Sequence, residues 1–151
     1  EVVAGHVLTI FLIGAVQAAV VLTVTGFLGT LWLTAGWGVL VVTLLGTVFV
    51  ASGLAICLSG LVRSTMLIGW LTGGVPTLLA MTGGAFFPLE AAPLALQKVA
   101  RINPVYWVME LFEEGYVYEG VAGQLWPLSV LLLIGMLGAV IGIQGLRRVE
   151  L

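Results

Sequence analysis

The sequence predicts an all-α protein: a polytopic membrane helix bundle with four transmembrane helices and short re-entrant or interfacial helices on its outer side. Two features of the composition support this fold class. Hydrophobic residues make up 61% of the chain, whereas only 8% of the residues are charged. Soluble domains contain roughly a quarter charged residues, and a chain with so few cannot cover a water-exposed surface with polar groups. Membrane lipid is the solvent that fits this composition.

The distribution of the charged residues is the third observation, because it leaves long charge-free stretches. These stretches are 2–62, 64–89 and 120–146. A spanning helix needs about 20 apolar residues, so the first stretch accommodates two helices and each of the others one. We therefore expect a single transmembrane domain over 1–151, with spans at about 7–28, 39–62, 65–82 and 125–146 and an outer helical region at 83–124.

The outer region 83–124 holds most of the charged side chains. Pro93 is well placed at a helix start, and Pro104 should end that helix near Ile102. A second helix is expected at about 105–117. Both helices are too short to cross a bilayer. We expect them to lie at the interface, or to dip into the membrane and return.

The two short outer helices carry opposite charges. Lys98 and Arg101 share one face of the first helix, and Glu110, Glu113 and Glu114 share one face of the second. A turn between the helices would bring these faces together. An exposed ion pair contributes only about 0–1 kcal/mol, but near the headgroup boundary water screens charges less. We hypothesise that Lys98, Arg101, Glu110 and Glu113 hold an outer gate shut.

The basic residues near the ends of the predicted spans indicate the orientation. Four spans place both termini on one side of the membrane, and that side then holds Arg63, Arg147 and Arg148. The other side holds Lys98 and Arg101 together with the glutamates of the outer region. Because cytoplasmic segments carry an excess of Lys and Arg, we expect cytoplasmic termini in a multi-pass protein of the cell membrane.

The sequence predicts no catalytic, cofactor-binding or metal-binding site. His6 is the single histidine and Asp is absent, so a metal site would need distant carboxylates. No Gly-rich phosphate loop ending in Lys-Ser/Thr is present, and the chain is not expected to hydrolyse ATP by itself. Cys57 is the only cysteine and is expected to be a small apolar core residue. Five basic residues form no basic stripe, which argues against nucleic acid as a partner.

Two features of the predicted spans suggest helix packing. Gln17 lies in the middle of the span at 7–28, and an amide at membrane depth is costly and usually faces protein or a cavity. Packing between helices is the favoured role of Gln17, and contact with a transported molecule is the alternative. Gly138 and Gly142 form a small-xxx-small pattern that lets helices approach closely. We interpret this pattern as packing, with a dimer face as the other possibility.

The outer region contains a recognisable string of residues. Gly84-Ala85-Phe86-Phe87-Pro88-Leu89-Glu90 leads to Pro93, Leu96-Gln97, Ala100-Arg101 and Asn103-Pro104. This string resembles the signature of type-2 ABC transporter permeases, particularly the members that export drugs and polymers. The resemblance covers essentially the whole chain, as the third to sixth transmembrane helices of such a permease.

The resemblance implies both a structure and a function. In that family the segment forms a short re-entrant helical element on the outer face, which here would involve Phe86, Phe87, Pro88, Glu90, Asn103 and Pro104. It also implies a permease subunit without a catalytic site of its own. A second permease copy, in a homodimer or heterodimer, would complete a pathway for a hydrophobic drug, a lipid or a lipid-linked polymer. A separate ABC ATPase subunit would bind the ATP.

The chain departs from the family pattern at two positions, which leaves the substrate open. Glu113 stands where a basic residue often follows the Asn-Pro element, and His6 stands where Lys is usual. The first two helices of the family and the main surface that docks the ATPase would lie before Glu1. A second interpretation of the sequence is a membrane subunit that does no transport, and instead assembles or anchors partners through its small-residue faces.

The four-span topology predicts the side of the membrane on which two positions are labelled. Cysteines introduced singly by Gly120→Cys and Arg148→Cys should react with an impermeant thiol reagent from opposite sides. Four spans place Arg148 on the same side as the N-terminus, so Arg148→Cys should be labelled from inside. One span separates Gly120 from Arg148, so Gly120→Cys should be labelled from outside. Labelling of both positions from the same side would contradict this topology.

Overall fold

The computed structural model describes residues 2–28, 36–62, 64–117 and 121–147, and every regular element in these ranges is a helix. The all-α fold class is therefore confirmed. The long helices are α1 (Val2–Leu28), α3 (Gly36–Leu61), α4 (Thr65–Thr82) and α7 (Leu125–Arg147). The short ones are the 3₁₀ turn η1 (Leu89–Ala91), α5 (Leu94–Ala100) and α6 (Pro104–Val117).

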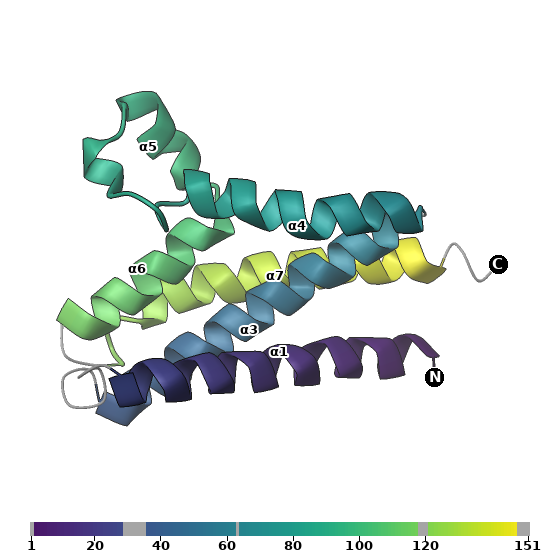
Figure 1. The fold of residues 1–151 in the computed structure, drawn as a ribbon, viewed down its shortest axis with the longest axis horizontal. Coiled ribbons are helices and arrows are strands. Elements are labelled where there is room, and N and C mark those ends of the chain that lie inside the picture. The colour runs from purple at the N-terminus through teal and green to yellow at the C-terminus, as the bar shows by residue number, and fades with distance from the viewer. Residues whose placement is uncertain (1, 29–35, 63, 118–120, 148–151) are drawn as a thin grey trace.

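The four long helices run lengthwise through the molecule (Figure 1). The start of α1, the end of α7 and the turn from α3 to α4 lie at one end, which we call the terminal end. The segment after α4, together with α5 and α6, lies at the opposite end, which we call the α6 end. Both termini therefore share one end of the bundle, as an even number of spans requires.

The observed helices follow the predicted spans closely. α4 has the predicted bounds, while α1 begins earlier than expected, at Val2. The predicted bounds came from the length of a bilayer span, and a helix is not limited to that length. α3 and α7 each contain a segment long and apolar enough to cross a membrane, Gly36–Leu61 and Leu125–Leu146. In α1 and α4 the apolar segments among the described residues are shorter. That all four helices cross a membrane remains a prediction.

Several sequence predictions concern residues beyond those described. Most of the segment between the first two predicted spans lies there, as do Arg63 and Arg148. Trp37, also between those predicted spans, is in the first turn of α3, and its ring is exposed. An exposed indole ring beside a span end fits a headgroup position.

Glycine contacts hold α3 and α7 together. A Cβ atom placed on Gly53 of α3 would lie 2.2 Å from the carbonyl oxygen of Gly135 of α7. A Cβ atom on Gly142 would lie 2.2 Å from the carbonyl oxygen of Ile56. No side chain fits at such distances, so the two backbones are in direct contact. The predicted small-xxx-small pattern at Gly138 and Gly142 thus packs α7 against α3 of the same chain.

A small core covers this helix pair at the α6 end. Val50 of α3, Leu111 of α6 and Leu131 of α7 are buried together. Trp107 of α6 also packs against this core, and its ring meets Trp126 of α7 edge to face, with 6.4 Å between the ring centroids. Such aromatic pairs contribute about 0.5–1.5 kcal/mol beyond the area they bury. α6 is thereby attached to the α3–α7 pair.

The glycine contacts predict that Gly53→Ala separates α3 from α7. Overpacking of this kind costs about 1–3 kcal/mol, so the thermal midpoint of the purified full-length subunit should fall. The matched control is Gly73→Ala in α4, where a Cβ atom would meet nothing within 4 Å. That control should leave the midpoint unchanged or raise it, because alanine favours helix. Equal losses in the two variants would contradict the contact.

Candidate functional site

The chain turns sharply after α4. The helix ends at Thr82, and Gly84 follows with a φ of +90°, a conformation that glycine adopts without strain. At Gly83 the constraint is space. A Cβ atom there would lie 2.7 Å from the Cβ atom of Val105 in α6, too close for a side chain. The backbone is extended again at Pro88. The prediction that the span does not continue through Pro88 is therefore confirmed.

Asn103 joins the start of α6 to the end of α4. Its side-chain amide donates hydrogen bonds to the carbonyl oxygen of Leu79 (2.7 Å) and to the hydroxyl oxygen of Thr82 (2.8 Å). Its side-chain oxygen accepts from the backbone N–H of Val105 (2.9 Å), which caps α6. Pro104 occupies the first turn, where its missing N–H costs nothing. This junction gives the predicted Asn103-Pro104 element a physical role.

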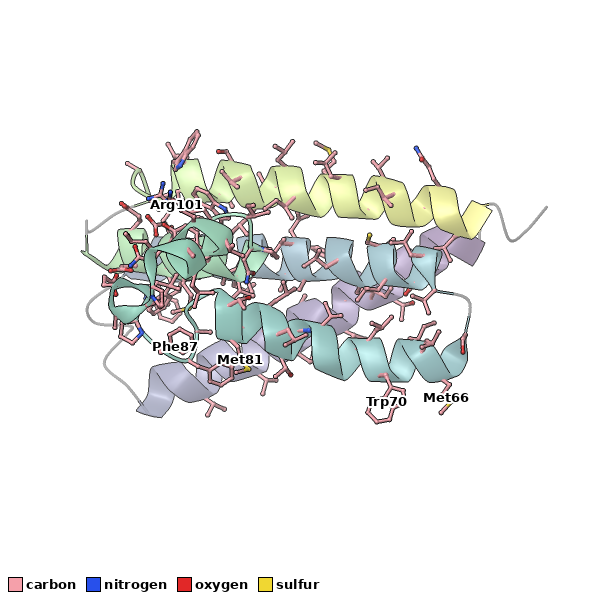
Figure 2. All side chains as sticks on the ribbon, turned by 90° about the horizontal axis from the view of Figure 1, so that it is seen from above. Met66, Trp70, Met81, Phe87 and Arg101 are labelled. Carbon is pink, nitrogen blue, oxygen red and sulfur yellow. The ribbon has the colours of Figure 1, made fainter. Side chains whose placement is uncertain are left out.

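A cleft of about 470 Å³ lies between the segment after α4 and one face of α6. We call it the hairpin cleft. It is lined by Gly83, Gly84, Ala85, Phe86, Phe87, Pro88, Leu89, Glu90, Tyr106, Met109, Glu110 and Glu113. The structure thus brings the predicted motif residues Phe86, Phe87, Pro88 and Glu90 together with Glu110 and Glu113. Figure 2 shows Phe87 and Arg101 at this end of the molecule, far from Met66 and Trp70.

Tyr106 is the residue on which several nearby charges act. Burial raises the pKa of its phenol, and the Glu110 and Glu113 carboxylates raise that pKa further, while the Arg101 guanidinium opposes them. Within the described residues, neither Lys98 nor Arg101 lies within 4.0 Å of a glutamate carboxylate oxygen. The two charged faces are therefore not joined by direct ion pairs here. The gate hypothesis for these charges remains a prediction.

Gln124, which the sequence did not single out, is fully buried just before α7. Its side-chain amide donates to the Thr43 hydroxyl oxygen (2.8 Å) and to the carbonyl oxygens of Leu111 (3.0 Å) and Val39 (3.4 Å). It therefore ties α7 to both α3 and α6. Its side-chain oxygen meets no donor among the described residues. An amide at the boundary of a span is commonly exposed to headgroups. The position of Gln124 in the sequence therefore gave no sign that its side chain is buried.

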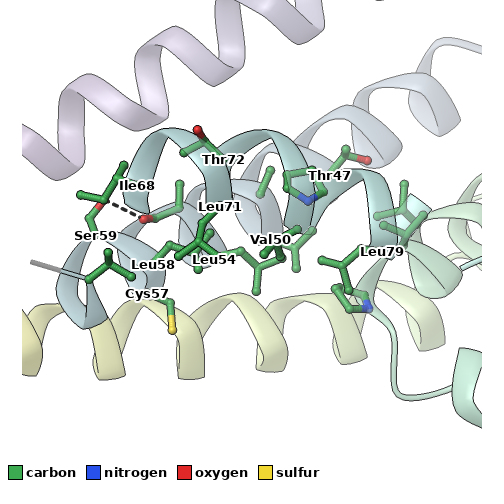
Figure 3. Close-up of a pocket in the computed structure, with 18 residues that line it drawn as sticks. Thr47, Val50, Leu54, Cys57, Leu58, Ser59, Ile68, Leu71, Thr72 and Leu79 are labelled. Carbon is green, nitrogen blue, oxygen red and sulfur yellow. Dashed lines mark hydrogen bonds between the residues drawn. The ribbon is translucent and has the colours of Figure 1, made fainter. Parts of the chain in front are cut away.

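A second cavity, of about 440 Å³, lies between α3 and α4 and reaches α6. We call it the α3–α4 cavity (Figure 3). Its lining is mostly aliphatic: Thr47, Val50, Ala51, Leu54, Ala55, Cys57, Leu58, Ser59, Val62, Ile68, Leu71, Thr72, Val75, Pro76, Leu79, Pro104, Val105 and Val108. Cys57, predicted as a core residue, is half-buried in this lining.

The hydroxyl groups in the α3–α4 cavity are all engaged within their own helices. Thr47 donates to the carbonyl oxygen of Thr43 (2.7 Å) and Ser59 to that of Ala55 (2.9 Å). Thr72 donates to the carbonyl oxygen one turn before it (3.0 Å). Because these donors are occupied, the cavity offers a ligand no free hydroxyl donor, and the rest of its lining is mostly hydrocarbon.

Gln17 faces a third, shallower hollow, of about 350 Å³, between α1 and α3. Gly14 and Thr43 also line it, and the Gln17 amide makes no hydrogen bond with the described residues. Its position beside a hollow agrees with the rule for amides at membrane depth. Its role in packing or in transport remains a prediction.

The described residues contain no group of three His, Cys, Asp or Glu side chains that could hold a metal ion. The His6 side chain is not among those described; only its backbone is placed, in α1.

Apolar helices in close glycine contact, with a helical segment tied across one end by two amides, are consistent with a membrane helix bundle. A family model described as ABC-2 type transporter matches residues 1–117, and the chain belongs to this family. The resemblance found in the sequence is therefore confirmed. Its members are membrane components of ABC transporters and work with an ATPase partner. No individual curated protein and no solved structure matches the chain.

The hydrogen bonds of Gln124 predict an unequal response to two substitutions. Gln124→Leu removes three hydrogen bonds, each with a net contribution of about 1 kcal/mol. Gln124→Glu places a carboxylate among three acceptor oxygens, and an unpaired buried charge costs about 3–5 kcal/mol. The thermal midpoint of the full-length subunit should therefore fall further for Gln124→Glu than for Gln124→Leu. The reverse order would contradict the burial of the Gln124 amide among these acceptors.

Proposed function

We propose that this chain is part of the permease subunit of an ATP-driven exporter of hydrophobic molecules. Two permease copies would enclose the translocation pathway, and a separate ABC ATPase subunit would bind and hydrolyse ATP. The observation that carries the hydrophobic substrate class is the α3–α4 cavity, whose volume of about 440 Å³ lies within the range of ligand sites in proteins. A hydrophobic drug, a lipid or the lipid part of a lipid-linked polymer suits such a lining.

The membrane changes how an apolar cavity selects its ligand. Lipid tails are as apolar as leucine side chains, so the cavity gains little by attracting hydrocarbon out of lipid. A substrate would first enter the bilayer from water and then reach the cavity sideways. The hydroxyl groups of Thr47, Ser59 and Thr72 already donate within their own helices, so they offer no free donor to a solute that needs one, and burying unpaired acceptor groups there is unfavourable. Selection would therefore favour molecules with a long apolar part.

The packing of α4 supports a mechanism of alternating exposure. Gly69, Gly73 and Gly74 of α4 have no neighbouring side chain or helix within 4 Å of where a Cβ atom would stand. Trp70 is 73% exposed and points away from the bundle (Figure 2). A rigid movement of α4 relative to α3 would change the shape of the cavity without disrupting a packed core. ATP binding to the partner subunit would bias the two positions.

In this proposal the termini lie in the cytoplasm and the α6 end faces the outside of the cell membrane. The hairpin cleft then opens on the side where substrate leaves. Lys98, Arg101, Glu110 and Glu113 would act there through longer-range charge interactions, because no direct ion pair joins them among the described residues.

The cavity predicts that a bulky side chain in its lining blocks transport. Ala55→Phe should abolish most of the substrate-stimulated ATP turnover of the intact transporter in proteoliposomes, because the ring occupies the space a substrate needs. The matched control is Ala19→Phe on an exposed face of α1, which should retain it. The assay would compare hydrophobic drugs, lipids and a lipid-linked sugar. Normal stimulation in a well-folded Ala55→Phe transporter would overturn the assignment of the cavity.

A further inference from the structure

The α3–α4 cavity is covered by α6 at one end. Pro104, Val105 and Val108 of α6 complete the lining there, beside Val50 of α3 and Leu79 of α4. We infer that α6 is the seal of this cavity, and that the Asn103 amide is the latch that keeps α4 against it. The part that this seal plays in export rests on the proposed function.

α6 stays with α3 and α7 because its attachment on that side is buried. Gln124 is fully buried and donates to groups on both α3 and α6. A Cβ atom on Gly115 of α6 would lie 2.4 Å from the Gln124 amide nitrogen and 2.5 Å from a methyl group of Val39. Separating these helices would deprive the fully buried Gln124 amide of every acceptor it has among the described residues and would open this close packing. This side of the seal is therefore fixed.

The attachment of α6 to α4 is different, because the core formed by Val50, Leu111 and Leu131 includes no residue of α4. Breaking this attachment also strands no group on α4. The carbonyl oxygen of Leu79 also accepts from the backbone N–H of Gly83 (2.8 Å). The Thr82 hydroxyl donates to the carbonyl oxygen of Leu78 (2.8 Å). Both groups keep these partners when the Asn103 amide leaves. The seal therefore opens by parting α4 from α6.

The latch can be tested by the accessibility of a thiol placed in the cavity. The background is the full-length subunit, in complex with its ATPase and with Cys57→Ser. Ala55→Cys introduces the thiol, and an impermeant methanethiosulfonate reagent is added to one side of the membrane at a time. In this background the thiol should react slowly from the α6 end.

Two substitutions release the latch in different ways. In Asn103→Ser the serine hydroxyl oxygen can still cap α6. The serine side chain is too short to reach α4. Thr82→Val leaves Asn103 intact and removes one of its two acceptors. Its matched control is Thr77→Val, because the Thr77 hydroxyl also donates to a carbonyl oxygen of its own helix but has no bond to Asn103.

Asn103→Ser and Thr82→Val should each raise the labelling rate from the α6 end several-fold, while Thr77→Val matches the background. Equal rates in all variants, or a rise with Thr77→Val as large as with Thr82→Val, would overturn the latch. Labelling of the thiol requires no transport. The experiment therefore tests the seal independently of the proposed export function. Faster labelling in a complex that transports nothing would leave the seal standing, and unchanged labelling in an active exporter would remove only the seal.

Discussion

The direct contact between the backbones of α3 and α7 is the interaction on which the rest of the structure depends. In lipid no hydrophobic driving force pulls two apolar helices together, so close packing has to supply the attraction. Gly53 and Gly142 allow this packing because no side chain stands between the carbonyl groups and the facing helix. The resulting pair is the platform on which α6 rests through Leu111 and Gln124. Without it, neither the α3–α4 cavity nor the hairpin cleft would keep its shape.

The glycines of α4 show the opposite arrangement and indicate where movement belongs. Gly69, Gly73 and Gly74 face open space, and the last turn of α4 is held to α6 through Asn103 and Gly83, the attachment that we infer to open. The molecule thus combines a rigid pair with one weakly attached helix, and the apolar cavity lies between them. A transporter needs such a division, because a cavity changes its exposure only where one wall moves relative to the other.

The candidate site was predictable from the sequence where it depends on local chemistry. The string from Phe86 to Glu90 was recognised as a unit, and its residues line one cleft together with Glu110 and Glu113. Asn103 was identified through the resemblance, as part of the Asn103-Pro104 element, although its bonds to α4 were not predicted. Gln124 was missed, because the sequence does not show that its acceptors on α3 and α6 surround it. Ion pairs between the short helices were expected, yet Arg101 acts on Tyr106 without pairing directly with a described carboxylate.

The sequence by itself determined the helical class, the positions of the long helices and the family, because each depends on local properties: the length of an apolar run, the place of a proline, the order of a short motif. Only the tertiary structure decided which glycines touch, which hydroxyl groups are already engaged and which amides are buried. These depend on contacts between residues far apart in the chain, such as Gly53 with Gly135 or Gln124 with Thr43. In a chain this uniformly apolar, hydrophobicity does not distinguish the face of a helix that meets protein from the face that meets lipid. That choice is made by the fit of backbones and the pairing of a few polar groups.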